Sequence, residues 1–365
     1  MKTVALLFGG RSGEHEISVL SARSVFGALR AAGFKVIGVG ITREGAWVYI
    51  GDCEDFFRKG FAEVTRGHGC PCFILPDPTR QGIWVEDNAK LVKVPVDVVF
   101  PALHGLFGED GTIQGLLEMS GLPYVGAGSL ASAICMDKDV TKRVLATHGV
   151  PHVPALVIER WVWTKRRDEV LLNLDRLISY PIFVKPSASG SSLGVSKVKR
   201  REMLPGALDL AFLYDVKALV EPAKEGFLEV ECSVLGNEEP RASVAGQILP
   251  SREFYDYEAK YLDESTRLVV PAPLDDALMD KVRKVAVDAF KATGCAGMAR
   301  VDFFVKPETG EVYVNELNTI PGFTTVSMYP KLWEASGLPY PDLVRTLIDL
   351  AFQKKEASWR EVRRK

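Results

Sequence analysis

Two uninterrupted apolar runs with a helical stretch between them constrain the fold of the first third of the chain. The runs Val4–Phe8 and Val36–Ile41 have the length and residue types of buried β-strands. Between them, apolar and small side chains recur at the three- and four-residue spacing of a helix over residues 17–29. The pattern predicts a β-α-β unit, the building block of a parallel sheet in an α/β fold.

The chain then continues with another apolar run and another helical pattern. Val94–Leu103 is apolar, and the helix-like segment Thr112–Met119 that follows it ends at Gly121. Parallel sheets bind ligands in the loops at the carboxyl ends of their strands. Two loops qualify, Gly9–Glu16 and His104–Gly111, and we expect ligand-binding residues in both.

The remaining two thirds predict a helix, a strand and a hairpin. The helix covers Asp137–His148, and the strand Pro181–Lys185 leads into a loop of small residues. Two further runs, Gly297–Val305 and Val312–Glu316, are joined by a polar turn, which predicts a β-hairpin. The stretch Glu253–Pro273 is polar and rich in tyrosine, and a loop of that length is usually a functional lid or disordered.

The composition indicates a globular protein with small-molecule partners. Apolar residues make up 47% of the 365 residues and charged residues 25%, which is typical of a folded domain. The formal net charge of −2 provides no drive towards nucleic acid or a membrane surface. The first apolar run is too short for a secretory signal, and no stretch approaches the roughly 18 apolar residues of a membrane span, so we expect a cytoplasmic location.

The six cysteines do not form a metal-binding pattern. Only Cys70 and Cys72 are neighbours, and no second pair completes a zinc site. We expect free thiols, either buried or facing solvent.

The loop Ser187–Gly194 directly follows Lys185 and consists almost entirely of serine, glycine and alanine. Backbone N–H groups in such a loop can cradle phosphate, and the lysine would add a positive charge. A plain flexible loop is the alternative interpretation. No G-x-x-x-x-G-K-[ST] sequence occurs, so the loop is not a Walker-type site.

Asp302, Glu316 and Asn318 offer hard oxygen ligands on the two strands of the predicted hairpin. This set suits Mg²⁺ bound together with nucleotide phosphates, whereas a solvated acidic hairpin is the alternative. Arg300 lies two residues before Asp302 and should point to the same side of its strand. It could neutralise an oxyanion in a transition state, or it could form a structural salt bridge with Asp302.

Eight collinear motifs resemble the D-alanine–D-alanine ligase family over essentially the whole chain. They are GGRSGEHEIS (9–18), HGLFGEDGTIQG (104–115), MDKDVTK (136–142), VKPSASGSSLGVSKV (184–198), EVECSVLGN (229–237), EFYDYEAKY (253–261), GMARVDFF (297–304) and NELNTIPGFTTVSMYP (315–330). Eight motifs in order are far more specific than any one alone.

The resemblance implies an ATP-grasp fold preceded by an N-terminal Rossmann-like domain with a parallel sheet. The implied domains are residues 1–131, which hold the first D-alanine, residues 132–225 with the phosphate loop, and residues 226–365 with the metal site and a lid loop at 251–273. The family also implies a homodimer.

The resemblance further implies which residues bind ATP and metal. Asp302, Glu316 and Asn318 match the ligands of two Mg²⁺ (or Mn²⁺) ions. The matched ATP-binding residues are Lys138, Lys185, Ser191, Ser192, Glu221, Glu229 and Lys260, with the two glutamates near adenine and ribose.

The implied reaction joins two D-alanines through a D-alanyl phosphate, for peptidoglycan precursor synthesis. Glu14 would hold the first ammonium, while Arg300 and the N–H of Gly322 would stabilise the oxyanion. The second carboxylate would bind Ser327 and Lys260. The other implied substrate-binding residues are His104 and Met328, and a hydrogen-bonded set of Glu14, Ser191 and Tyr261 would link the loops.

Three alternatives remain open at this point. D-lactate or D-serine could be the second substrate, although Lys260-Tyr261 agrees with the dipeptide-forming type. The chain could also be a non-catalytic protein that binds ATP or an amino acid. A dinucleotide-dependent oxidoreductase is disfavoured because Gly9-Gly10-x-x-Gly13 departs from G-x-G-x-x-G and Glu14 would oppose close approach of a pyrophosphate.

Overall fold

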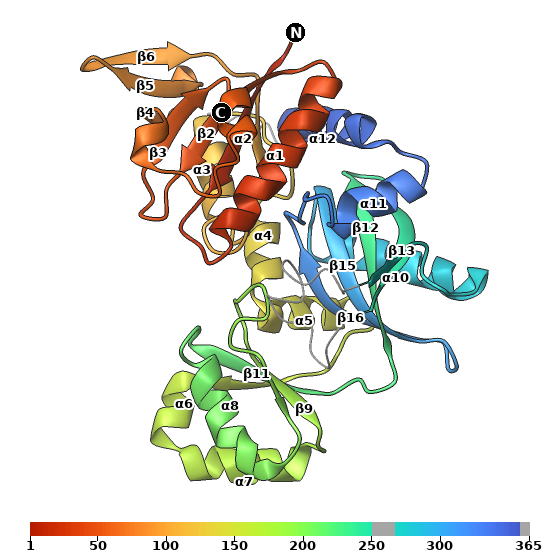
Figure 1. Cartoon of the computed structure of the whole chain (residues 1–365). Helices are drawn as coiled ribbons and strands as arrows, with labels where there is room; N and C mark the ends of the chain where they lie inside the picture. Colours follow the sequence, from red (N-terminus) through yellow and green to blue (C-terminus); the bar gives the residue numbers. More distant parts are fainter. Residues whose placement is uncertain (250–266, 358–365) are drawn as a thin grey trace, which may run out of the picture.

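The computed structural model describes residues 1–249 and 267–357, which form three sheets with helices packed on them (Figure 1). The largest sheet has seven strands in the order β6-β5-β4-β3-β2-β1-β7. Its strands are β1 (Thr3–Gly9), β2 (Lys35–Ile41), β3 (Trp47–Gly51), β4 (Cys70–Ile74), β5 (Ile83–Asp87), β6 (Lys90–Val94) and β7 (Val98–Pro101). Its helices are α1 (His15–Ala31), α2 (Glu54–Arg58) and α3 (Thr112–Ser120).

The predicted β-α-β unit is confirmed, but only part of this sheet is parallel. The pairs β1–β2 and β1–β7 are parallel, whereas β2 to β6 are joined by antiparallel pairs. The connections between these later strands lack a crossover helix of the length a parallel pair requires, since α2 has only five residues. The apolar run Val94–Leu103 also contains less strand than its composition suggests, because β6 ends at Val94 and β7 begins at Val98.

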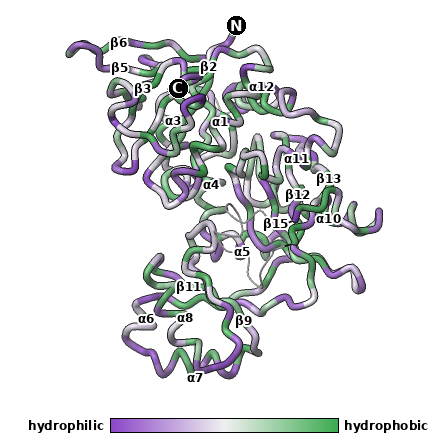
Figure 2. The backbone as a smooth tube through the Cα atoms, in the orientation of Figure 1, coloured by the Kyte–Doolittle hydropathy of each residue, from purple (hydrophilic) through white to green (hydrophobic). Residues whose placement is uncertain are grey.

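A four-stranded antiparallel sheet, in the order β10-β9-β11-β8, forms the lower part of Figure 1. Its strands are β8 (Leu156–Glu159), β9 (Ile182–Pro186), β10 (Ser196–Val198) and β11 (Lys217–Pro222). The helices α6 (Arg160–Lys165), α7 (Arg167–Leu177) and α8 (Leu204–Ala211) supply apolar residues to the same core as β9 and β11. The outer surface of α7 and the turn between β5 and β6 are hydrophilic (Figure 2).

The third sheet has five antiparallel strands in the order β14-β13-β12-β15-β16. They are β12 (Leu228–Gly236), β13 (Arg241–Leu249), β14 (Arg267–Val269), β15 (Gly297–Lys306) and β16 (Glu311–Asn318), so the predicted hairpin is confirmed. Helices α10 (Asp276–Ala292) and α11 (Met328–Ala335) pack on this sheet.

Two short helices, α4 (Ser129–Met136) and α5 (Lys138–Thr147), lie between the sheets in Figure 1. Asp137 separates them and caps α5, because its side chain accepts hydrogen bonds from the N–H groups of Asp139 and Val140. The predicted helix Asp137–His148 is thereby confirmed to within a residue at each end.

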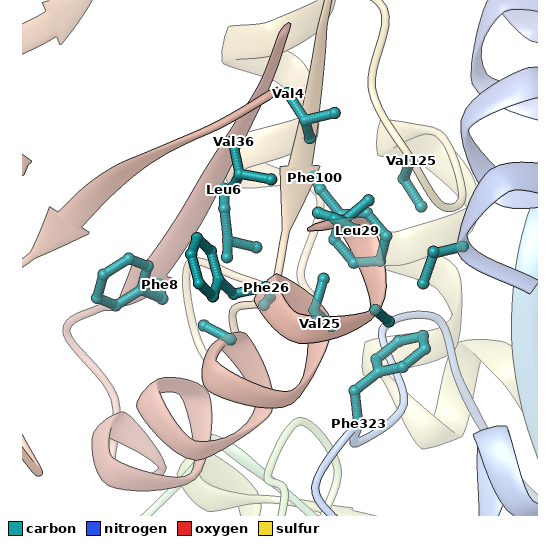
Figure 3. Packing of buried hydrophobic residues seen from close by; sticks show 14 of the residues in the cluster. Val4, Leu6, Phe8, Val25, Phe26, Leu29, Val36, Phe100, Val125 and Phe323 are labelled. Atoms are coloured by element: carbon teal, nitrogen blue, oxygen red, sulfur yellow. The ribbon is translucent and has the colours of Figure 1, made fainter. Parts of the chain in front are cut away.

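The core under the first sheet is completed by residues from the end of the chain. Helix α12 (Tyr340–Ala357) packs on α1 and β7. Phe323 points into the same cluster, near Val25, and its ring centroid lies 5.8 Å from that of Phe100 (Figure 3). The division into residues 1–131, 132–225 and 226–365 stays a prediction, and α12 shares its apolar core with the first of these segments.

The structure contains six free cysteines, of which Cys70 is exposed and the others are buried, so the prediction of free thiols is confirmed. Among the described residues, no helix combines the length and apolar character needed to cross a membrane.

Candidate active site

Two adjoining cavities lie where the three sheets meet. The first, of about 100 Å³, is lined by the loops after β1 and β7, by the ends of β15 and β16, and by residues 319–322 and 326–328. The second, of about 250 Å³, is lined by the four-stranded and the five-stranded sheets together with residues of the Ser187–Gly194 loop. Five residues line both cavities: Lys138, Ser189, Ser191, Glu231 and Glu316. A ligand in one cavity therefore lies next to a ligand in the other.

The structure brings together nearly all of the site residues expected from the sequence. The first cavity contains Glu14, His104, Lys138, Ser191, Arg300, Glu316, Asn318, Gly322, Ser327 and Met328. The second contains Lys138, Lys185, Ser191, Ser192, Glu221, Glu229, Asp302 and Glu316. Lys260 and Tyr261 lie outside the described residues, as does most of the expected lid.

Strand alternation explains why these polar residues face the second cavity. In β9, Ile182 and Val184 enter the apolar core while Phe183 and Lys185 line the cavity. In β15, Val301 enters the apolar core while Asp302 lines the cavity. The cavity is thus bounded by charged side chains interspersed with apolar ones such as Phe183 and Ile248, on the sheet faces that turn away from the two apolar cores.

Glu14 and Ser191 meet although they lie 177 positions apart. The Ser191 hydroxyl donates a hydrogen bond to Glu14 Oε1, which links the loop after β1 to the loop after β9. Two glycines make room for the carboxylate. A Cβ at Gly105, whose φ is +72°, would lie 2.7 Å from Glu14 Oε2, and a Cβ at Gly190 would lie 2.9 Å from it. A side chain at either position would therefore push the Glu14 carboxylate from its place, and at Gly105 the left-handed backbone would also be strained.

His104 is a buried connection between the first sheet and the last third of the chain. Its Nε2 lies 2.8 Å from Ser21 Oγ and its Nδ1 lies 3.2 Å from the carbonyl oxygen of Ile320. Ser21 Oγ also accepts a hydrogen bond of 3.2 Å from the N–H of Phe323. Burial lowers the pKa of His104 below its ordinary value, so the ring is neutral at pH 7. This network holds the segment that contains Gly322 against the loop after β7.

The lysines of the second cavity already have acidic partners. Lys138 Nζ donates to the Ser189 carbonyl oxygen at 2.7 Å and lies 3.3 Å from Glu316 Oε2. Lys185 Nζ lies 2.8 Å from Glu221 Oε2. The side chain of Glu221 is 4% exposed, and burial alone would raise its pKa, but the nearby lysine charges hold that pKa below its ordinary value. A nucleotide contact by Glu221 or Glu229 stays a prediction.

Asp302 and Glu316 lie directly opposite one another on β15 and β16. The amide of Asn318 donates to Asp302 Oδ2 at 3.1 Å, so three oxygen-bearing side chains converge. Within residues 1–249 and 267–357, no three His, Cys, Asp or Glu side chains form a group that could hold a metal. The converging set instead consists of two carboxylates and one amide, a donor chemistry that fits a hard divalent cation bound jointly with phosphate oxygens.

Arg300 forms the salt bridge that the sequence left as one of two possibilities. Its Nε and one terminal nitrogen donate to the two oxygens of Asp302 at 2.7 and 2.6 Å, and Nε lies 3.1 Å from Glu231 Oε2. Arg300 also lines the first cavity. A salt bridge and a role towards a ligand are therefore compatible.

The end of the first cavity is shaped by Gly322 and Ser327. A Cβ at Gly322 would lie 2.6 Å from Ser327 Oγ, so a side chain there would displace the hydroxyl. Ser327 Oγ accepts a hydrogen bond of 3.0 Å from the N–H of Thr324. Met328 is buried beside them at the start of α11.

Sequence reasoning missed several charged residues at or near the cavities. Glu109 and Glu231 line them, and Lys142 forms a buried ion pair with Glu221. Lys142 could have been found, because it follows Lys138 by four residues and so lies on the same face of a helix. Glu109 stands in the loop His104–Gly111, which the sequence did single out, but nothing in its spacing distinguishes it from Asp110.

Glu109 gives a prediction about pH. Burial, and then the charge of Glu14, raise its pKa to about 8 from an ordinary value of 4.5. Between these values the folded state keeps a proton that the unfolded chain has lost, so the contribution of Glu109 to stability falls as pH rises. We expect the Tm of the wild-type chain to drop between pH 5 and pH 8.5 relative to that of Glu109→Gln, as measured by calorimetry.

The control for this experiment is Glu86→Gln, because Glu86 is exposed on β5 and lines neither cavity. Its Tm should follow the wild-type curve at every pH. Parallel curves for wild type and Glu109→Gln would contradict the prediction.

Family models and related proteins match almost the whole length of the chain. Residues 3–127 match the family model described as the D-ala D-ala ligase N-terminus, and residues 144–349 match that of the D-ala D-ala ligase C-terminus. The chain is 49% identical over 353 residues to a D-alanine–D-alanine ligase of Caldicellulosiruptor bescii, covering 96% of this chain and 95% of that one. It is 47% identical to a D-alanine–D-alanine ligase of a Thermoanaerobacter species, with 99% of each covered.

The chain is also similar in fold to solved structures of ligases. The D-alanine-D-alanine ligase from Coxiella burnetii has a TM-score of 0.81 at 38% identity, covering 98% of this chain and 97% of that one. The VanG D-Ala:D-Ser ligase from Enterococcus faecalis has a TM-score of 0.83 at 36% identity, covering 96% and 99%. These likenesses extend over nearly the whole of each chain, and the fold is therefore ATP-grasp. The chain belongs to the D-alanine–D-alanine ligase family.

Proposed function

We propose that this chain uses ATP to join two D-alanine molecules into D-alanyl-D-alanine, a step in peptidoglycan precursor synthesis. The observation that carries the proposal is the sharing of Lys138, Ser191 and Glu316 by the two cavities. ATP in the second cavity would direct its terminal phosphate towards an amino acid in the first. Phosphoryl transfer from one ligand to the other needs this proximity.

In the first half of the reaction, one carboxylate oxygen of D-alanine attacks the γ-phosphorus of ATP, and ADP leaves. Glu14 would hold the ammonium group of this D-alanine, and Ser191 would fix the orientation of Glu14 through their hydrogen bond. Lys138 and Lys185 would contact the phosphates, where their charge offsets the negative charge on the transferred group. The product is D-alanyl phosphate.

In the second half, the neutral amine of another D-alanine attacks the acyl carbon. A tetrahedral oxyanion forms and collapses to the peptide bond as the acyl C–O bond breaks; inorganic phosphate leaves and takes up the proton that the amine nitrogen loses. Arg300 and the N–H of Gly322 would donate to this oxyanion, since both line the first cavity. Ser327, with Lys260 from outside the described residues, would bind the second carboxylate, beside His104 and Met328.

Divalent cations complete the proposal. Asp302, Glu316 and Asn318 would hold Mg²⁺ or Mn²⁺, and the bound ions would supply charge neutralisation of the phosphates.

We also propose the three domains 1–131, 132–225 and 226–365, a lid at 251–273 that includes Tyr261, a homodimer and a cytoplasmic site of action. Sedimentation of the purified chain measures the oligomeric state.

The function is tested by incubating purified chain with ATP, Mg²⁺ and D-alanine, with L-alanine, D-lactate and D-serine in parallel arms. Phosphate release and product mass are measured together. Equal amounts of phosphate and D-alanyl-D-alanine, formed only with D-alanine, support the proposal. A mixed product with D-serine would favour the specificity named for the VanG enzyme, and no ATP consumption in any arm would favour a binding role.

Ser191→Ala should weaken D-alanine binding, because Glu14 loses the hydrogen bond that orients its carboxylate. A hydrogen bond to a charged group contributes about 1.5–3 kcal/mol, so the KM for D-alanine should rise about 10-fold or more. Steady-state kinetics at saturating ATP measures this change. The matched control is Ser129→Ala, whose hydroxyl also donates to a glutamate, Glu118, but lines neither cavity, and it should leave that KM close to the wild-type value. Equal KM values for both variants would count against the role of Glu14.

A further inference from the structure

Lys142 is a buried cation behind the wall of the second cavity. Its side chain is 7% exposed, and it does not line either cavity. Its Nζ lies 3.0 Å from Glu221 Oε1 and donates to the Val153 carbonyl oxygen at 2.8 Å. Lysine is almost never this deeply buried without a partner, so the ion pair accounts for its position.

Glu221 is shared between two lysines. Its second oxygen lies 2.8 Å from Lys185 Nζ, which also donates to Asn315 Oδ1 at 3.2 Å. Burial lowers the pKa of Lys142 to about 8, so its ammonium is still mostly charged at pH 7. Two ammonium groups and one carboxylate give this cluster a formal net charge of +1. Lys185 and Glu221 line the second cavity, so that charge is presented to a ligand there.

We propose that Lys142 is a positioning residue for the nucleotide: it neutralises Glu221, so that the charge of Lys185 remains available to phosphate. The inference rests on the proposed use of ATP. Without Lys142, Lys185 would be the one described lysine that pairs with Glu221, and these two groups together would have no net charge. The carboxylate of Glu221 would then attract Lys185 and weaken its interaction with the phosphates.

Lys142 also connects segments that are attached to different sheets. It lies on α5, its ion-pair partner lies on β11, and the segment that accepts its hydrogen bond is bound to β16 through the N–H of Val153 and the carbonyl oxygen of Val314, at 3.0 Å. Replacing Lys142 therefore removes contacts to both of the sheets that line the second cavity.

The test compares three variants of the full chain: Lys142→Met, Lys142→Arg and the double variant Lys142→Met/Glu221→Gln. We expect Lys142→Met to raise the KM for ATP about 10-fold or more, because truncating one partner of a buried charge pair is costly. The KM for D-alanine should stay near the wild-type value. Lys142→Arg should restore most of the ATP affinity, since it keeps the charge.

The double variant separates charge from packing. Removing the carboxylate together with the lysine returns the formal net charge to +1, and glutamine keeps an acceptor oxygen at the cavity wall. We therefore expect its KM for ATP to fall back towards wild type. The matched control is Lys354→Met, because Lys354 is another buried lysine but contacts Gly126 and the ring of Tyr124, away from the cavities. It should leave the KM for ATP unchanged.

A wild-type KM for ATP in folded Lys142→Met, or a double variant no better than Lys142→Met, would overturn the inference. If Lys142→Met does not fold by circular dichroism, Glu221→Gln and the double variant decide, because neither carries an unpaired buried carboxylate. Because Lys142 acts through Glu221, the inference then requires the same KM for ATP in Glu221→Gln and in the double variant, and a higher KM in the double variant overturns it.

Direct ATP binding, measured by thermal shift, distinguishes failure of the proposed function from failure of the inference about Lys142. If wild type makes no dipeptide but binds ATP, and Lys142→Met weakens that binding, only the proposed function fails. If wild type makes dipeptide and all variants bind ATP equally, only the inference about Lys142 fails.

Discussion

Replacing Arg300 with methionine is expected to lower the kcat of dipeptide formation by about 10²–10³, the usual effect of removing one oxyanion donor. The guanidinium lies in the first cavity and is held by both oxygens of Asp302 and by Glu231, so it is already oriented before any ligand binds. Because its charge acts on the oxyanion, kcat should fall further than the KM for ATP rises. Product formation in steady state, measured by mass, checks this.

Two further variants make the Arg300 result specific. Arg300→Lys keeps one charge but loses the paired contact with Asp302, and it should recover only part of kcat. Arg283→Met is the matched control, because Arg283 pairs with exposed Asp280 on α10 and lines neither cavity. A kcat for Arg300→Met within a factor of three of wild type, in a chain with unchanged Tm, would show that the salt bridge is its whole role.

Asp302→Asn is expected to raise the Mg²⁺ concentration for half-maximal activity by about 10-fold or more and to lower kcat at saturating Mg²⁺. Asparagine keeps the shape and one oxygen, but it removes a negative charge from a set of only two carboxylates and one amide. Chelation of divalent cations should abolish activity in wild type, and added Mg²⁺ or Mn²⁺ should restore it. A Mg²⁺ titration of initial rates measures both effects.

The control for this titration is Asp288→Asn, since Asp288 pairs with Lys284 on the exposed side of α10. Its Mg²⁺ dependence should match wild type. If Asp302→Asn does so as well, or if chelated wild type keeps its full rate, then Asp302 does not hold the metal.

Local patterns in the sequence predict the helices and strands that carry the site. Alternation places Lys185 and Asp302 on the polar faces of β9 and β15, and the predicted hairpin brings Asp302 opposite Glu316. The helix α5 could likewise be predicted from its period and from the capping residue Asp137. For these elements, neighbouring residues determine the structure.

Contacts between distant segments could not be predicted in the same way. The pairing of Lys142 with Glu221 joins residues 79 positions apart, and nothing local to either indicates the other. The mixed order of the first sheet depends on short antiparallel connections that apolar runs do not reveal. His104 stood in a predicted loop, but its link to Ser21 and Ile320 depends on the packing of the chain's last third.

The shared core of the first sheet has a consequence for synthesis of the chain. Translation runs from the N-terminus, so β1, β2 and β7 leave the ribosome long before Phe323 and α12, whose side chains fill the same cluster. Until those residues arrive, part of the apolar surface of the nascent sheet stays uncovered, and such surface is prone to aggregation. The first sheet to be made is therefore among the last parts of the structure to be completed, and a chaperone that shields it during elongation would bind this uncovered surface.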